Sequence, residues 1–224
     1  MSVSTLFPVP TVTWEIDGSD VRFPVRRVLC IGKNYADHIQ EMGGAEMGGA
    51  AKADRGDAPT VFTKSARCLV PGGRMPYPAN TEELHWETEL VVAIGADGEV
   101  WGHAVGLDMT RRDLQAEAKR TGGTWDRAKS FPASAPLGAL RKGSVDADAG
   151  LSLRVNGDVR QRSSLRHMMW SVEEIVEFLR ADMGLAAGDL VFTGTPAGVG
   201  ACVPGDVLEA EVEGLPPLRV KVVD

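Results

Sequence analysis

The sequence predicts a β-rich α+β fold, and three features of its 224 residues support this prediction. Short runs in which apolar and polar residues alternate, the pattern of half-buried strands, recur along most of the chain. A few segments with helical periodicity are inserted between these runs. The helical segments do not alternate with the strands one for one, as a doubly wound parallel sheet would require, so that such a sheet is disfavoured.

The N-terminal segment predicts a β-hairpin. Trp14 and Phe23 each lie in a stretch of alternating apolar and polar residues, and the Asp-Gly pair that begins at Asp17 is a turn sequence. We expect residues 1–27 to form a small N-terminal lobe around this hairpin. Residues 28–224 are expected to form one larger domain, because a chain of this length can bury a core without disulfide or metal staples.

The next segment predicts a buried strand, a helix and a long loop. Residues 28–31 are all apolar, and the helix is expected over residues 35–42. Asn34 can cap this helix, with Asp37 three residues later in a capping-box arrangement. Residues 43–58 are rich in glycine and alanine, which predicts a mobile loop. A loop of this length is either functional or a spacer, and both interpretations remain open.

The middle of the chain predicts further strands and a second helix. Strand-like runs lie at residues 60–64, 84–95 and 100–109. The helix is expected to begin after Thr110, whose hydroxyl group can accept a hydrogen bond from the first turn. It is expected to end at the glycine pair that starts at Gly122, because glycine readily adopts the left-handed conformation that closes a helix.

The C-terminal third predicts a hairpin, the clearest helix of the chain and two more strands. Asn156 and Gly157 form a hairpin turn between two alternating runs. Ser171 and Glu174 form a capping box at the start of a helix that ends at Gly184. Alternating apolar and charged residues then predict half-buried strands at 207–213 and 218–223.

The composition is that of an ordinary globular protein and argues against several classes of function. The formal net charge of −7 disfavours nucleic-acid binding, for which a basic patch is expected. No apolar stretch approaches the roughly 20 residues that cross a bilayer. The first residues do not have the pattern of a signal peptide. We therefore expect a cytoplasmic protein with neither a nucleic-acid nor a membrane partner.

The cysteines indicate neither a disulfide framework nor a zinc knuckle. Their number is odd, and no two have C-x-x-C spacing. We expect Cys30, Cys68 and Cys202 to be reduced and buried.

Two glutamates in the run 84–95 are the first candidates for chemistry. On a strand, residues two apart point to the same face, so Glu87 and Glu89 are expected to project side by side. Apolar Val91 and Ala93 continue that face, which suggests that it points into the protein. Two buried carboxylates repel each other unless a cation lies between them. The alternative is that both glutamates form the polar outer face of an exposed strand.

Asp108 can supply a third carboxylate, because it ends the run 100–109 just before the second helix. Three oxygen ligands without a cysteine or histidine cluster suit a hard cation such as Mg²⁺ or Mn²⁺, and Ca²⁺ could take their place in crystals. Three protein ligands also leave coordination positions for water and substrate, as a catalytic site requires.

Three further residues are weaker candidates. His38 and Glu41 are neighbours on the first helix, and a glutamate beside a histidine can orient it as a general base. The alternative is an ordinary solvated helix face. Lys129 lies among small and apolar residues that would suit a partly desolvated lysine, although a single lysine is by default a surface residue.

The segment 194–200, GTPAGVG, is glycine-rich but matches neither the P-loop nor the dinucleotide-binding template. It is interpreted either as a loop that offers backbone amides near the substrate or as a tight turn.

Several motifs together resemble the fumarylacetoacetate hydrolase family. They occur in the order found in that family and span nearly all of the chain from Val28 onward. The resemblance implies a mixed β-roll with a few inserted helices, a homodimer, and a metal-dependent enzyme that cleaves carbon–carbon bonds in diketo acids or acts on related oxo acids. The matching segments are GKNYADHIQEMG, LHWETELVVAIG, GLDMTRRDLQ, WDRAKSFPASAP, VNGDVRQ and GDLVFTGTPAGVG.

The same resemblance assigns roles to individual residues. It implies that Glu87, Glu89 and Asp108 bind Mg²⁺ or Mn²⁺. It implies that His38 and Glu41 activate water from a lid over the substrate. Three more residues resemble positions that bind substrate, Lys129 at the metal-bound oxo acid and Gln115 and Thr195 elsewhere in the pocket.

Within the family, the short N-terminal lobe and the segment SSLRHMMWSVEEIVEFL are most similar to bacterial fumarylpyruvate hydrolases of the gentisate type of aromatic catabolism. This resemblance implies hydrolysis of a 3-acylpyruvate, 3-fumarylpyruvate, to fumarate and pyruvate. Oxaloacetate decarboxylation and dienedioate isomerisation would use the same site, and a non-catalytic, metal-stabilised binding module is a further alternative. The chain has Trp86 where many relatives have histidine, and its 43–58 loop is longer than expected. The resemblance therefore does not determine the shape of the pocket wall or of the lid.

Overall fold

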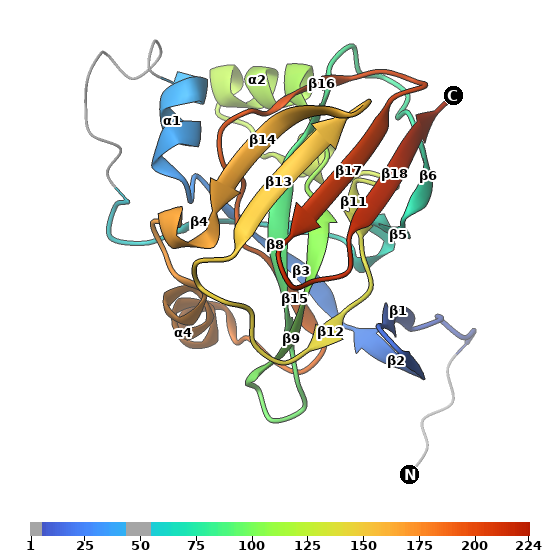
Figure 1. Ribbon diagram of the computed structural model, residues 1–224, viewed down its shortest axis with the longest axis vertical. Coiled ribbons are helices and arrows are strands. Elements are labelled where there is room, and N and C mark those ends of the chain that lie inside the picture. Colours follow the sequence, from blue (N-terminus) through green and yellow to red (C-terminus); the bar gives the residue numbers. More distant parts are fainter. Residues whose placement is uncertain (1–5, 44–54) are drawn as a thin grey trace.

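The computed structural model describes residues 6–43 and 55–224, and its largest sheet contains eight strands (Figure 1). These are β3 (Arg27–Gly32), β4 (Thr60–Lys64), β5 (Leu69–Pro71), β8 (Thr88–Ile94), β9 (Val100–Leu107), β11 (Ala135–Leu137), β12 (Arg141–Lys142) and β15 (Asp189–Phe192). Their order is β4-β3-β15-β8-β9-β11-β5, with β12 also paired to β9. The sheet is mixed, because β15 runs parallel to β3 and β11 parallel to β5, whereas the other pairs are antiparallel.

Two smaller sheets and a hairpin complete the strands of the described residues. The five-stranded sheet has the order β14-β13-β17-β18-β6, the three-stranded sheet has the order β10-β7-β16, and β1 pairs with β2. Their bounds are β1 (Val12–Ile16), β2 (Ser19–Val25), β6 (Gly73–Pro76), β7 (Leu84–Trp86), β10 (Thr110–Arg111), β13 (Gly150–Val155), β14 (Asp158–Ser164), β16 (Gly200–Cys202), β17 (Val207–Val212) and β18 (Leu218–Val223).

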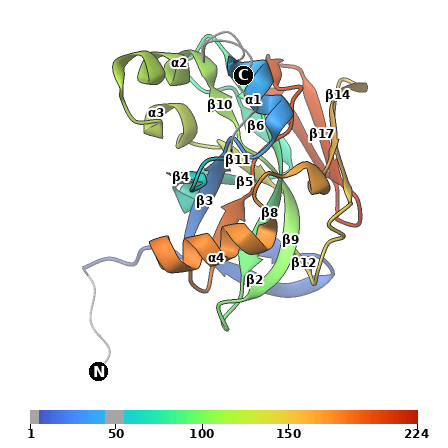
Figure 2. The ribbon, with the colours of Figure 1, turned by 90° about the vertical axis from the view of Figure 1, so that its left-hand side faces the viewer.

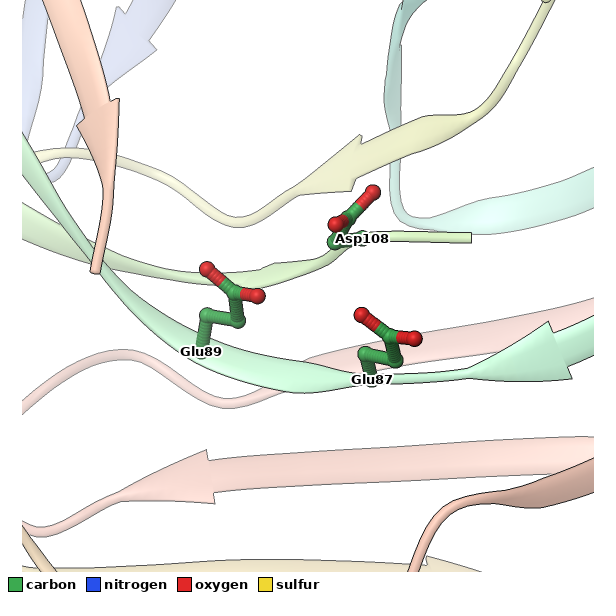
Figure 3. A group of neighbouring side chains, drawn as sticks. All are labelled: Glu87, Glu89 and Asp108. Carbon is green, nitrogen blue, oxygen red and sulfur yellow. The ribbon is translucent and has the colours of Figure 1, made fainter. Parts of the chain in front are cut away.

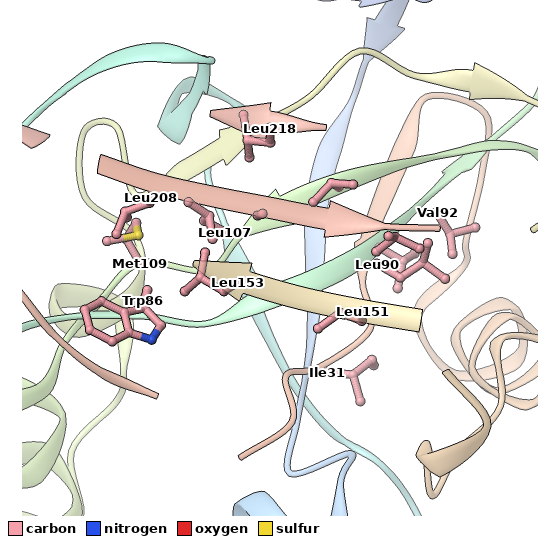
Figure 4. Close-up of a cluster of buried hydrophobic side chains, with 14 of the residues drawn as sticks. Ile31, Trp86, Leu90, Val92, Leu107, Met109, Leu151, Leu153, Leu208 and Leu218 are labelled. Carbon is pink, nitrogen blue, oxygen red and sulfur yellow. The ribbon is translucent and has the colours of Figure 1, made fainter. Parts of the chain in front are cut away.

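The central sheet is covered on both faces, which explains why every residue of β8 is buried. On one face, Leu90 and Val92 belong to the same apolar cluster as Leu151 and Leu153 of the five-stranded sheet (Figure 4). On the other face, Val91 clusters with side chains of the β1–β2 hairpin and of β3. Burying both faces removes a large apolar area from water, the main source of stability in a fold of this size.

Helices occupy the periphery of the sheets. They are α1 (Ala36–Gly43), α2 (Arg112–Thr121), α3 (Asp126–Lys129) and α4 (Val172–Met183), with short 3-10 turns at Ala66–Cys68 and Leu165–His167. Helices α1 and α2 lie at the same end of the molecule in both views, and α4 lies toward the other end (Figures 1 and 2). None of the helices in the described part of the chain is long and apolar enough to cross a membrane.

The β-rich α+β class predicted from the sequence is confirmed, as are both predicted hairpins. The capping box of Ser171 and Glu174 is present, and Gly122 and Gly184 end α2 and α4 in the left-handed conformation. The three cysteines are unpaired and buried. The hairpin packs against β3 through the shared cluster that contains Trp14 and Phe23. The division of the chain into a lobe at 1–27 and a domain at 28–224 stays a prediction.

Two predicted helix caps are wrong. The side chain of Asn34 instead donates to the carbonyl oxygens of Trp170 and Thr193 and accepts from the backbone N–H of Trp170. The hydroxyl group of Thr110 donates to the carbonyl oxygen of Asp108, and α2 begins two residues later without a side-chain cap. Both polar groups are fully buried, and a partner elsewhere in the fold outweighs a local cap.

Two further predictions need revision. The run 84–95 is two strands, because β7 ends at Trp86 and joins the three-stranded sheet, whereas β8 begins at Thr88 in the central sheet. The short helix α3 was not predicted at all. Most of the predicted 43–58 loop, residues 44–54, lies outside the described residues.

Candidate active site

Three carboxylates meet where β7 passes into β8 (Figure 3). Glu89 lies on β8, Glu87 lies in the break between the two strands, and Asp108 directly follows β9. The backbone N–H of Asp108 donates to the carbonyl oxygen of Glu87 at 2.8 Å, so the antiparallel register places the two side chains opposite each other. One carboxylate oxygen from each residue lies within 4.8 Å of the others, and all three residues are at most 5% exposed.

Three cationic side chains surround these carboxylates. The Lys129 ammonium donates to Glu87 Oε2 at 2.7 Å and to Asp108 Oδ2 at 2.6 Å. Lys64 Nζ lies 2.7 Å from Asp108 Oδ1, and Arg112 Nη2 donates to Glu87 Oε1 at 2.6 Å. Both lysines are almost fully buried, so these pairs are desolvated and interact strongly.

Glu89 is the carboxylate that these cations leave uncompensated. Its Oε2 accepts a hydrogen bond from the backbone N–H of Gly194 at 2.7 Å, and within the described residues no lysine, arginine or histidine forms an ion pair with it. Burial, together with the negative charges of Asp108 and Glu87, therefore raises the pKa of Glu89 well above its ordinary value.

The pKa of Glu87 moves in the opposite direction. Burial alone would raise it, but the nearby charges of Lys129 and Arg112 lower the pKa of Glu87 far below its ordinary value. For Lys129, burial alone would lower the pKa, and the charges of Asp108 and Glu87 raise it overall. The site therefore contains two carboxylates that are paired with cations, Glu87 and Asp108, and a third, Glu89, that has no cationic partner within the described residues.

The donor set fits a hard divalent cation. Carboxylate oxygens are ligands that Mg²⁺, Mn²⁺ and Ca²⁺ prefer, and a bound cation would supply the positive counter-charge that the Glu89 carboxylate lacks. The described residues place no cysteine or histidine in this group of ligands, which disfavours a softer metal. Glu87, Glu89 and Asp108 can therefore hold such an ion.

Metal binding is expected to release a proton, because the raised pKa of Glu89 favours its protonated form in the metal-free protein. Mn²⁺ must displace that proton, so the affinity for Mn²⁺ falls as the pH falls through the pKa of Glu89. Calorimetric titration with Mn²⁺ in buffers of different ionisation enthalpy should show proton release that is greater at lower pH, where more of Glu89 is protonated before the metal binds. Mn²⁺ binding without proton release at low pH would contradict the prediction.

His38 and Glu41 are brought together on α1. His38 Nδ1 lies 3.5 Å from Glu41 Oε2, and His38 is 8% exposed. Burial lowers the pKa of His38 below its ordinary value, although the negative charge of Glu87 and the contact with Glu41 oppose this effect. A lowered pKa keeps the imidazole neutral near pH 7, which is the form that can accept a proton.

The glycine-rich segment 194–200 contacts both groups of acidic residues. The backbone N–H of Gly194 donates to Glu89, and that of Gly198 donates to both carboxylate oxygens of Glu41, at 3.0 and 3.1 Å. Gly198 has a φ of +95°, and a Cβ atom there would collide with the carbonyl oxygen of Arg160. Of the two interpretations of this segment, the structure favours a loop that offers backbone amides to the site.

The remaining predicted residues line the same cavity, which has a volume of about 290 Å³. Gln115 Oε1 accepts a hydrogen bond from Arg112, and Thr195 Oγ1 accepts one from Gln161 at 2.8 Å. Seven of the eight residues singled out in the sequence line this cavity, and Glu41 contacts one of them, His38. The exposed alternatives for Glu87, Glu89 and Lys129 are wrong, since all three are buried.

Several residues at the site were not predicted from the sequence. Lys64 ends an alternating strand and resembles any strand lysine, yet its ammonium contacts Asp108 and the carbonyl oxygens of Met109 and Lys129. Arg112 is the second of two consecutive arginines, and only the fold shows that it reaches Glu87. Trp125, which packs against Phe62 of β4 in the cavity wall, directly precedes α3, which was not predicted.

Comparisons with known proteins identify the family to which the chain belongs. A family model described as "Fumarylacetoacetate (FAA) hydrolase C-terminal" matches residues 27–223. A crystal structure of fumarylpyruvate hydrolase from Pseudomonas aeruginosa, in complex with Mn²⁺ and pyruvate, is 43% identical and superposes with a TM-score of 0.88 over 98% of this chain and 99% of that one. The mixed β-roll expected from the sequence resemblance is therefore confirmed.

Two curated relatives differ in the reaction that they are named for. Fumarylpyruvate hydrolase of Ralstonia sp is 39% identical over 72% of this chain and 91% of its own length. The mitochondrial oxaloacetate tautomerase of Rattus norvegicus is 36% identical over 88% of this chain and 91% of its own length.

Proposed function

Because the chain belongs to the fumarylacetoacetate hydrolase family, we propose that it hydrolyses the carbon–carbon bond of a 3-acylpyruvate, with 3-fumarylpyruvate as substrate and fumarate and pyruvate as products. The observation that carries this proposal is the placement of the Glu87–Glu89–Asp108 site, His38 and Lys129 around one cavity. The similarity to two fumarylpyruvate hydrolases, one of them solved with Mn²⁺ and pyruvate, supports the choice of acyl group.

Mg²⁺ or Mn²⁺ held by the three carboxylates would act as a Lewis acid, polarising the oxygens of the oxo acid and offsetting negative charge that develops on them. Gln115 and Thr195 line the cavity and supply polar groups that orient the oxo acid. Arg112 donates hydrogen bonds to both Glu87 and Gln115, which fixes the positions of these two side chains relative to each other.

The His38–Glu41 pair would generate the nucleophile. Neutral His38 accepts a proton from water, and Glu41, held by Gly198, orients the imidazole and stabilises its charged form. The hydroxide adds to the distal carbonyl carbon, and the electron pair of the adjacent C–C bond passes to the pyruvate fragment, which leaves as its enolate. The ammonium group of Lys129, which is fixed between Glu87 and Asp108, would stabilise the negative charge that develops on this fragment. Protonation at carbon then yields pyruvate.

A second reaction is favoured by one observation, the similarity to an oxaloacetate tautomerase. Oxaloacetate is also a 2-oxo acid, and its decarboxylation or the isomerisation of a dienedioate would pass through the same kind of enolate. A non-catalytic binding module is disfavoured, because a purely structural metal site needs neither the His38–Glu41 pair nor the buried Lys129.

An assay panel with Mn²⁺ separates these functions. We expect 3-fumarylpyruvate, followed by the loss of its diketo-acid absorbance, to be turned over faster than acetylpyruvate or oxaloacetate. Fumarate and pyruvate should be formed from it in equal amounts. Glu87→Ala should abolish turnover, because it removes a metal ligand and leaves Lys129 and Arg112 without their shared partner. Turnover of oxaloacetate but of neither acylpyruvate would contradict the hydrolase function and favour the second reaction. A lack of turnover on every oxo acid would favour the binding module.

The proposal also includes a cytoplasmic homodimer that acts in aromatic catabolism of the gentisate type. The similarity to bacterial fumarylpyruvate hydrolases supports the pathway and the location. Light scattering after size-exclusion chromatography tests the assembly, for which a mass of twice 23.9 kDa is expected.

A further inference from the structure

Lys33 is held in an unusual backbone conformation beside the active-site cavity. Its φ is +61°, a value that residues other than glycine and asparagine seldom adopt and that costs roughly 1 kcal/mol. It lies between the end of β3 and the start of α1, and its exposed side chain forms part of the cavity lining. Strain of this kind persists where surrounding contacts enforce it, and it is frequent at ligand-binding positions.

The residues on either side of Lys33 enforce this conformation. The backbone of Gly32 lies against Thr60 and the ring of Trp125, within 3.4 and 3.7 Å of an ideal Cβ position. Asn34 is fully buried and is fixed by three hydrogen bonds, with Trp170 and Thr193 as its partners. The base of the Lys33 side chain is therefore anchored at the cavity, although its ammonium group is exposed.

Lys33 also differs from the other cations of the cavity in its charge partners. Lys129 and Arg112 are paired with carboxylates of the metal site. Within the described residues, the ammonium group of Lys33 has neither an ion pair nor a hydrogen bond. Lys119, in the last turn of α2, lines the same cavity and adds a second positive charge. The cavity lining therefore includes positive charge that is suited to an anion.

Apolar side chains lie in the same cavity as these lysines and the carboxylates. Phe62 and Trp125 pack edge to face, with ring centroids 5.8 Å apart, and Ile31 and Ile39 contribute to the same lining. A planar, unsaturated carbon chain suits such a wall, because aromatic rings stack well on flat apolar groups. A substrate with an oxo acid at one end, a flat carbon spacer and a second carboxylate would match all three chemical parts of this cavity.

We propose that Lys33, assisted by Lys119, forms a subsite for the distal carboxylate of the substrate and selects dicarboxylic over monocarboxylic acylpyruvates. The proposal rests on the proposed function, because it assumes that the oxo acid end occupies the metal site. It assigns Lys33 to specificity rather than to bond cleavage.

The test compares Lys33→Met with the wild-type enzyme on two substrates, both with Mn²⁺. For 3-fumarylpyruvate, which has the distal carboxylate, kcat/KM should fall about fivefold to tenfold, mainly through KM, because a partly exposed ion pair is lost. For acetylpyruvate, which lacks it, kcat/KM should not change. Lys33→Arg should retain most of the preference, and Lys142→Met, an exposed lysine on β12, is the matched control for the loss of one charge.

A binding measurement separates this proposal from the proposed function. Calorimetry with 2-oxoadipate and 2-oxopentanoate, which differ only in the distal carboxylate, should show tighter binding of the dicarboxylate to the wild type, and Lys33→Met should remove this preference. If this pattern is found while 3-fumarylpyruvate is not hydrolysed, the subsite stands and the proposed function is wrong. Equal effects of Lys33→Met on both ligands or on both substrates, or binding of neither oxo acid, would overturn the subsite.

Discussion

Replacing Glu89 by glutamine is expected to abolish the response to divalent metal and to lower kcat/KM by several orders of magnitude. Without the third carboxylate, the site has two ligands that are already paired with Lys129, Lys64 and Arg112. Metal Lewis-acid catalysis contributes several kcal/mol to such reactions, so its loss corresponds to roughly 10³-fold or more. The Mn²⁺-dependent rise in Tm that is expected for the wild type should be absent in the variant.

The same substitution is expected to stabilise the metal-free protein. Burial, Asp108 and Glu87 raise the pKa of Glu89, so the native state binds a proton more tightly than the unfolded chain does. Metal-free wild type therefore loses stability as the pH rises from the ordinary glutamate pKa through the raised one. Glutamine keeps the acceptor for Gly194 and does not ionise, so the gain in Tm over wild type should be greater at about pH 8 than at about pH 5.

The control is Glu177→Gln, which removes an exposed carboxylate on α4 and should change neither the Tm nor the Mn²⁺ response. A metal-free Glu89→Gln protein that is less stable than wild type at both pH values would show that Glu89 is stabilised as an anion by contacts within the fold.

These predictions depend on features that sequence periodicity captures only in part. Period-two spacing correctly placed Glu87 and Glu89 on a common face, even though Glu87 lies in a break between two strands. The break itself was not predictable, because it arises from pairing with β10 and β16, which are distant in sequence. Long-range pairing decides where a strand changes sheets, and local residue patterns do not encode it.

Polar residues at element ends were the least predictable part of the fold. Asn34 and Thr110 have the chemistry of helix caps, and their sequence context favoured that role. In the structure, Asn34 links β3 to the segment before α4, and Thr110 accepts a hydrogen bond from Lys129. Each choice between a local and a distant partner depends on burial, which a single sequence does not show.

The candidate site also contains some residues that could be predicted from the sequence and others that could not. The acidic residues, His38, Glu41 and Lys129 could be selected because their motifs occur together in a known order. Lys64, Arg112 and Lys33 could not, because their function depends on where a strand end, a helix start and a strained turn lie in space. Basic residues are common on surfaces, so their type alone carries little information.

His38→Ala is expected to lower kcat by about 10²-fold to 10⁴-fold while leaving the affinity for Mn²⁺ unchanged. The imidazole lines the cavity and is not among the grouped carboxylates, so its removal takes away the proton acceptor without removing a ligand. His167→Ala, which alters an exposed histidine, should leave kcat unaffected and serves as the control. Added imidazole should restore part of the lost activity, since the truncated side chain leaves space for it.

The pH profile provides the decisive readout for this residue. His38 must be neutral to accept a proton, and burial lowers its pKa, so activity should be lost as the pH falls through a value below the ordinary histidine pKa of 6.5. Glu41→Gln removes a charge that raises this pKa, so it should lower kcat and move the acidic limb to still lower pH. An acidic limb that persists unchanged in His38→Ala would assign the titration to another group and remove His38 from the mechanism. Because the metal affinity is measured on the same variants, loss of Mn²⁺ at acidic pH can be distinguished from protonation of the base.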